Sequence, residues 1–185
     1  MTSLRWPRGG SDQFRKRINR APSPFIARGL PWLSIMLASL VPGWLVIASA
    51  PVMPPLGFLV LVAWRQLRPG LLPVWAGLPL GLFDDLYSGQ PLGSAVLLWS
   101  LAMIVLEVIE ARFPWRNIIV EWLVAAALIL AYILLCLAIA NAVGGSSPIQ
   151  VIVPQTIVAI LVYPLIARMV GGLDRARLIP FRDIG

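Results

Sequence analysis

The sequence predicts an all-α integral membrane protein with six transmembrane helices and both termini in the cytoplasm. Three observations support this fold class. First, 59% of the 185 residues are hydrophobic and only 12% are charged, about half the ~25% charged share of a soluble domain. Second, the apolar residues gather in six stretches. Third, the basic residues fall in alternate connections. The formal net charge of +7 on so apolar a chain indicates a cytoplasmic membrane face rather than nucleic acid.

The first 30 residues form a basic segment without a long apolar run. We expect a largely flexible cytoplasmic tail, whose charge suits the anionic headgroups of the inner leaflet. Its seven basic residues are Arg5, Arg8, Arg15, Lys16, Arg17, Arg20 and Arg28. The expected organisation is this tail over 1–30, a six-helix membrane domain over 31–170, and a basic cytoplasmic C-terminal tail over 171–185. Asp12, Asp174 and Asp183 lie in these tails, and we expect them to be solvated.

Six apolar stretches are the candidate membrane spans. They cover residues 31–49, 51–64, 70–86, 91–109, 117–140 and 150–170. The fifth is the clearest, and the second is short, since its 14 residues reach only about 21 Å as a helix against a hydrocarbon core of ~30 Å. One re-entrant hairpin made of stretches two and three would place Arg65 and Arg68 near the bilayer centre, at roughly 2.5–3.5 kcal/mol each. Two separate spans avoid that cost.

The basic residues test this arrangement independently of hydropathy. Beyond the tail they occur only as Arg65 and Arg68 after stretch two, Arg112 and Arg116 after stretch four, and four arginines from Arg168 onward. The connections after stretches one, three and five contain none. Because cytoplasmic loops collect Lys and Arg, this alternation predicts an even number of crossings with both ends inside.

The residues that the chain lacks narrow its chemistry. It contains no His and one cysteine, Cys136. The chain therefore has no Ser-His-Asp triad, no His-bound metal and no intrachain disulfide. We expect no cofactor, no metal and no enzyme activity.

A first charged cluster is predicted at the cytoplasmic turn between stretches four and five. Its members are Glu107, Glu110, Arg112, Arg116 and Glu121. Glu107 and Glu110 are three residues apart and share a helix face. The cluster is either a set of local ion pairs at the headgroup level or a docking surface for a partner.

A second acidic cluster, Asp84-Asp85, ends stretch three on the outer side. One interpretation is that one Asp faces water while the other bonds backbone N–H groups of the turn. Ser88 or Gly89 would then help to start the next helix, with Pro91 in its first turn. The other interpretations are a recognition role and a Mg²⁺ site at a phosphate, although this face offers no third carboxylate.

Small and aromatic residues give weaker signals. Gly77 and Gly81 form one G-x-x-x-G step, and Gly89 and Gly93 form another. Such steps allow close helix packing, but Pro79 argues against an ideal seam in the first. Tryptophans cluster near the expected span ends, as in interfacial belts: Trp32, Trp44, Trp64, Trp75, Trp99, Trp115 and Trp122.

The segment from Gly81 to Gly93, GLFDDLYSGQPLG, resembles the signature of the MreD family of bacterial rod-shape-determining proteins. The Asp of that signature falls on Asp85, and Gly89, Pro91, Leu92 and Gly93 match directly. Asp84 occupies a position that is usually apolar. The candidate partner-binding or structural motif is therefore Gly81, Asp84, Asp85, Ser88, Gly89, Pro91, Leu92 and Gly93.

The resemblance implies a non-enzymatic scaffold in the bacterial inner membrane that helps to direct side-wall peptidoglycan synthesis. Its implied partners are MreC and, through it, the actin-like MreB and the glycosyltransferase RodA with its transpeptidase. The family is also similar in fold to the substrate-binding subunits of energy-coupling-factor transporters. Two other functions stay open: a transport subunit whose outer pocket is lined by the acidic pair and tryptophans, and an enzyme acting on a lipid-linked phosphate.

Overall fold

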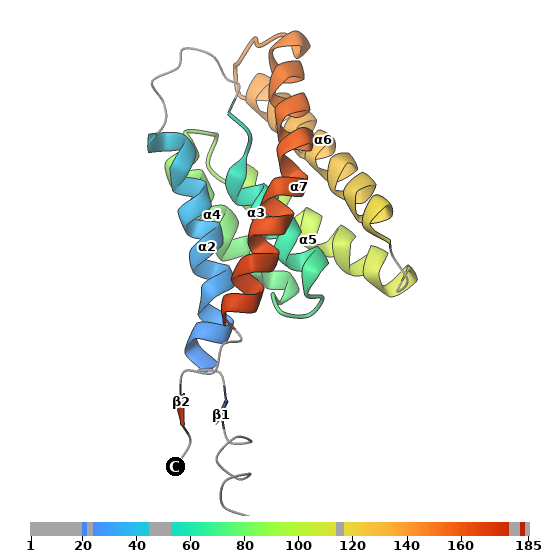
Figure 1. Cartoon of the computed structure of the whole chain (residues 1–185). Coiled ribbons are helices and arrows are strands. Elements are labelled where there is room, and N and C mark those ends of the chain that lie inside the picture. Colours follow the sequence, from blue (N-terminus) through green and yellow to red (C-terminus); the bar gives the residue numbers. More distant parts are fainter. Residues whose placement is uncertain (1–19, 22–23, 45–52, 114–116, 178–181, 184–185) are drawn as a thin grey trace, which may run out of the picture.

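The computed structural model describes residues 20–21, 24–44, 53–113, 117–177 and 182–183, and this part of the chain is almost entirely helical (Figure 1). The helices are α2 (Pro24–Trp44), α3 (Leu56–Leu67), α4 (Gly77–Ser88), α5 (Ser94–Arg112), α6 (Ile118–Ala142) and α7 (Ile152–Arg177). Two short 3₁₀ turns, η1 (Val74–Ala76) and η2 (Ile149–Val151), precede α4 and α7. Each helix overlaps one predicted apolar stretch, which confirms the all-helical class.

Two helix boundaries differ from the predicted segments. Helix α2 begins at Pro24, inside the segment assigned to the N-terminal tail. Helix α7 continues to Arg177 rather than ending near residue 170. The continuation has a packing reason, because Asp174 and Arg177 form an i,i+3 ion pair and are both buried.

The helices alternate in direction along the chain (Figure 1). The start of α2 and the end of α7 lie at the same end of the bundle, where β1 (Arg20–Ala21) pairs antiparallel with β2 (Arg182–Asp183). We call this the arginine end and the opposite one the loop end. Within the described chain, α5, α6 and the run Ile149–Arg177 are long and apolar enough to cross a membrane. Six crossings remain a prediction.

Helix α3 occupies the centre of the bundle and contacts α2, α5, α6 and α7. Nine of its 12 residues are buried. At 1.5 Å per residue it reaches only about 18 Å, well short of a ~30 Å hydrocarbon core. Non-helical backbone at membrane depth is tolerated where protein surrounds it. The central position therefore explains how so short a helix fits.

Helices α4 and α5 pack closely against each other. A Cβ on Gly81 would lie 2.6 Å from the carbonyl oxygen of Ala95, and one on Gly77 would lie 2.8 Å from Cα of Ser100. The G-x-x-x-G step therefore makes a tight seam, and the expectation that Pro79 would prevent it is wrong. Pro79 is the third residue of α4, where a missing N–H breaks no hydrogen bond of the helix.

The aromatic residues divide between core and surface. Trp64 and Trp99 are fully buried, so the interfacial role predicted for them is wrong. The indole Nε1 of Trp64 donates to Oγ of Ser34 at 2.8 Å, which accounts for its place inside. Trp75 and Trp122 are 61% and 37% exposed, as an interfacial belt requires.

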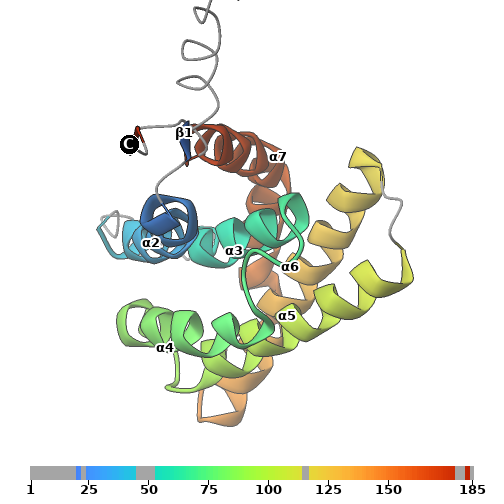
Figure 2. The same ribbon diagram turned by 90° about the horizontal axis from the view of Figure 1, so that it is seen from below.

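Helix α6 is exposed over most of its length. Only four of its 25 residues are buried. Seen from below, the end of α5 and the start of α6 extend away from the other helices (Figure 2). An apolar helix exposed on most of its surface requires lipid or another protein around it.

Candidate functional site

The family-like motif builds a cap between two helices at the loop end. Asp85 near the end of α4 is 3% exposed, and its carboxylate accepts backbone N–H bonds from Gly93 at 2.9 Å, Ala95 at 2.9 Å and Val96 at 3.2 Å. The hydroxyl of Ser94 also donates to it, at 3.2 Å. One carboxylate thus satisfies the free N–H groups at the start of α5, where the helix dipole favours negative charge.

Two glycines with positive φ shape the connection around this cap. Gly89, at φ 69°, ends α4, and Gly93, at φ 93°, precedes α5. A residue with a Cβ rarely adopts this conformation. The predicted bonding of one Asp to turn N–H groups is confirmed. The residues predicted for the start of the next helix are wrong, because Gly93, not Ser88 or Gly89, precedes the first residue of α5, and Pro91 lies before the helix. The second G-x-x-x-G step therefore lies in a turn rather than on a helix seam.

The carboxylate of Asp84 takes no part in this cap. It is 8% exposed, beside Ser39 of α2, so the expectation that the second Asp faces water is wrong. Consecutive helical residues do not share a face, and the two carboxylates consequently enter different surroundings. In the described residues, no group of three or more His, Cys, Asp or Glu could hold a metal ion.

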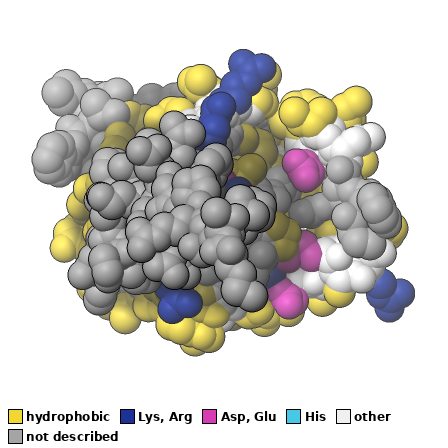
Figure 3. Space-filling view, turned by 60° about the horizontal axis from the view of Figure 1, so that its bottom comes forward, with side chains coloured by type: hydrophobic (Ala, Val, Ile, Leu, Met, Phe, Trp, Pro, Cys, Tyr) yellow, Lys and Arg dark blue, Asp and Glu magenta, His cyan; other side chains and the backbone are white. Residues whose placement is uncertain are grey.

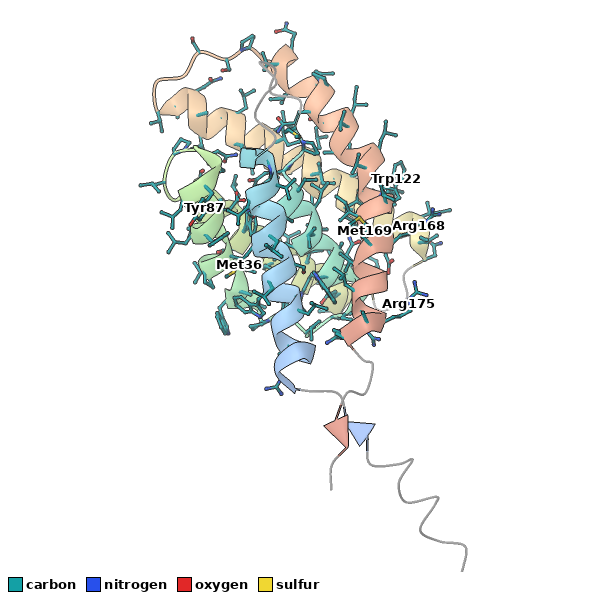
Figure 4. The ribbon with its side chains drawn as sticks, turned by 60° about the vertical axis from the view of Figure 1, so that its left-hand side comes forward. Met36, Tyr87, Trp122, Arg168, Met169 and Arg175 are labelled. Atoms are coloured by element: carbon teal, nitrogen blue, oxygen red, sulfur yellow. The ribbon has the colours of Figure 1, made fainter. Side chains whose placement is uncertain are left out.

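The exposed part of the motif is apolar. Leu86, Tyr87 and Leu92 are 64%, 56% and 77% exposed, and we call these three residues the outer tip. Tyr87 projects from the surface of the bundle (Figure 4), with its ring 4.9 Å from that of Phe83. The motif therefore buries its charge and presents hydrophobic side chains.

A buried arginine organises the arginine end. Arg65 of α3 is 2% exposed, and its guanidinium pairs with Glu107 and, at 3.0 Å, with Glu110 of α5. Nη1 of Arg65 also donates to the carbonyl of Leu72 at 3.0 Å. Arg65 was predicted to lie in the connection after the second apolar stretch, whereas it lies within α3 and is buried. Glu107 remains 55% exposed, whereas Glu110 is 12% exposed.

A second charge network joins α3 to α7. Asp174 is 5% exposed and pairs with Arg68 at 2.9 Å and Arg177 at 2.7 Å. The guanidinium of Arg177 lies 5.7 Å from the ring centre of Trp64, within cation–π range. The predicted solvation of Asp174 is therefore wrong. Asp12 lies outside the described residues.

The predicted cytoplasmic cluster is only partly assembled. Arg112 is exposed, Glu121 lies on α6, and Arg116 is outside the described residues. Arg112 is two residues from Glu110 and five from Glu107, so it does not share their helix face. This spacing already indicated that the cation paired with Glu107 and Glu110 comes from another helix. In the described part of the face shown in Figure 3, acidic and basic side chains lie among hydrophobic and other side chains.

Hollows between the described helices include one of about 90 Å³ between α3, α5 and α6 and two larger ones. A cavity of about 410 Å³ opens between α3, α6 and α7 toward the arginine end. A smaller one of about 180 Å³ lies near the loop end, beside Gln90 and Cys136. None of these three is lined by Asp84 or Asp85.

Long apolar helices with an exposed hydrophobic surface and charges buried in pairs define a helical membrane protein. The family model described as rod shape-determining protein MreD matches residues 23–170. The chain therefore belongs to the MreD family, a family of bacterial membrane proteins that act in rod-shape determination. No curated protein and no solved structure matches the chain.

Proposed function

We propose that this chain is a non-enzymatic scaffold of the cell-elongation complex in the bacterial inner membrane. It binds MreC and, through MreC, works with MreB, RodA and its transpeptidase to direct lateral peptidoglycan synthesis. The family match over residues 23–170 carries this proposal.

The contacts with MreC are proposed at the two ends of the bundle. At the loop end, Asp85 is fully used as a helix cap, so the outer tip rather than the carboxylate supplies the binding surface. Tyrosine is a frequent anchor of protein interfaces, and Leu86 and Leu92 add apolar surface near Tyr87. The motif then acts by holding the outer tip in one position.

At the arginine end, Glu107 is the proposed contact. Arg65 holds its carboxylate in place from the buried side, while more than half of the side chain remains exposed. A charge held in a fixed position loses little side-chain entropy on binding. Arg112, exposed at the end of the same helix, supplies a positive charge on a different face of α5.

Site-directed photocrosslinking in cells that produce MreC tests this arrangement. A crosslinking amino acid at Tyr87, Leu92 or Glu107 is expected to capture MreC. The matched control is Leu161 on α7, which is 69% exposed and apolar but belongs to neither end. Capture at Leu161 alone, or at none of the positions while MreC is present, would contradict the proposed surface.

Charge reversal provides an independent test in living cells. Glu107→Lys is expected to round the cells and to lower MreC recovery, whereas Glu107→Gln keeps the shape and is expected to have a weaker effect. Unchanged shape and recovery with both variants would remove Glu107 from the interface.

A further inference from the structure

The cavity of about 410 Å³ is lined neither by the motif nor by Arg65 and its two glutamate partners. It is lined by α3, by the first turns of α6 and by the middle of α7. Ala63, Ile119 and Ala167 give it apolar walls. Its surroundings are hydrophobic too, since Ile118, Leu165 and Met169 are each at least 60% exposed. The cavity therefore opens on a surface of the kind that contacts acyl chains.

The polar groups at the back of this cavity already have protein partners. The hydroxyl of Tyr163 donates to Oε1 of Gln66 at 2.8 Å, and Nε2 of Gln66 donates to the backbone carbonyl of Glu121 at 3.2 Å. Trp122 donates through Nε1 to the carbonyl of Ile160. These bonds connect α3, α6 and α7 and hold the cavity open as a defined shape.

Two residues of opposite charge line the same cavity, Glu121 and Arg168. No ion pair joins them in the structure, and Arg168 is exposed while Glu121 is partly buried. Arg168 lies five residues, about 7.5 Å, after Tyr163 along α7, and Tyr163 is linked through Gln66 to the backbone carbonyl of Glu121. Because the Cα–Cβ bonds of a helix tilt toward its N-terminus, a side chain of this length at Arg168 can extend back along α7 in the direction of Tyr163. Figure 4 shows Trp122 and Arg168 on the same side of the bundle.

We propose that this cavity binds one zwitterionic phospholipid with a primary ammonium headgroup, of the phosphatidylethanolamine type. The guanidinium of Arg168 binds the phosphate through paired N–H donors. The carboxylate of Glu121 accepts hydrogen bonds from the ammonium group, and one acyl chain lies along the apolar walls.

The two charges together select this headgroup. A phosphatidylglycerol headgroup would satisfy Arg168 but would bring no cation to Glu121. A phosphatidylcholine headgroup carries a positive charge but has no N–H to donate. A headgroup with both a phosphate and an N–H-bearing cation matches both residues.

Native mass spectrometry of the full chain tests the proposal, with phosphatidylethanolamine, phosphatidylcholine and phosphatidylglycerol of identical acyl chains as the probes. The expected result is a retained phosphatidylethanolamine adduct, about tenfold preferred, as one charge-assisted hydrogen bond to Glu121 supplies. Glu121→Gln is expected to equalise phosphatidylethanolamine and phosphatidylcholine. Ala167→Phe, which fills the cavity, is expected to lower every adduct.

Arg175→Gln is the matched control. This arginine is exposed on the same helix, outside the cavity, and its Nε donates to the carbonyl of Gly171. The variant is expected to keep the wild-type preference. Equal adducts for the three lipids, a preference for phosphatidylglycerol, or an unchanged preference in Glu121→Gln would overturn the proposal. A copurified protein that displaces the lipid from the cavity would also overturn it.

Discussion

Removal of the Asp85 carboxylate should destabilise the α4–α5 hairpin strongly. In Asp85→Ala, the backbone N–H groups of Gly93, Ala95 and Val96 lose their acceptor, and two of these bonds are 2.9 Å long in the wild type. Loss of an N-cap costs about 0.5–2 kcal/mol. Loss of a partly buried negative charge at a helix N-terminus costs up to about 2 kcal/mol. The free energy of unfolding should therefore fall by roughly 3 kcal/mol.

Thermal unfolding in detergent, followed by tryptophan fluorescence, measures this loss. For a chain of 150–250 residues, 1 kcal/mol corresponds to about 2–4 °C, so Tm should fall by roughly 6–12 °C. Ser94→Ala removes only one hydroxyl donor from the same cap and should cost about 1 kcal/mol.

Asp84→Asn is the informative control for this prediction. Asp84 is buried, and the described residues supply it with no cation. Its conversion to a neutral amide should therefore cost little or even stabilise the fold. The assignment of Asp85 as the structural carboxylate is refuted if Asp85→Ala unfolds at the wild-type temperature, or if Asp84→Asn is the more damaging change.

Three further predictions concern the seam and the buried charges. Gly81→Ala should cost about 1–3 kcal/mol, since its Cβ meets backbone atoms of α5; Gly171→Ala, which meets nothing within 4 Å, should be neutral or stabilising in the same melting assay. Arg65→Ala leaves the mostly buried Glu110 without its cation and should lower the free energy of unfolding by about 3–5 kcal/mol. The double variant that also carries Glu110→Gln should recover part of this stability. If the effects of the two substitutions are strictly additive, Arg65 and Glu110 are not coupled. Asp174→Asn should loosen the contact between α3 and α7 by removing both ion pairs, so hydrogen exchange should accelerate at the end of α7 but not in α5.

The helices could be predicted because the hydropathy of a segment is read from its own residues alone. The apolar stretches located all six, and the short α3 was identified as a separate helix through Arg65 and Arg68, whose burial at the bilayer centre would have been too costly. The G-x-x-x-G step of α4 was noticed but discounted, because Pro79 was weighed as a helix breaker without its place in the first turn.

The charged contacts were less predictable because their partners are distant in sequence. Arg65 and Glu107 are 42 residues apart, and Arg68 and Asp174 are 106 apart. Nothing local to either residue indicates such a pair. Charge sorting correctly grouped these arginines at one end of the bundle, but it could not distinguish a solvated arginine from one buried between helices. The Asp85 cap was partly predictable, since its partners lie only 8 to 11 residues away.

The proposed binding surfaces and the lipid site all depend on six crossings with the arginine end in the cytoplasm. Substituted-cysteine labelling tests this most directly, because Cys136 is the only native cysteine and can be replaced by Ser. A new cysteine at Ser147, in the exposed connection between α6 and α7, should react with an impermeant maleimide added outside intact cells. A cysteine at Arg175 should react only in inverted vesicles. Labelling of both positions from the same side would contradict the account.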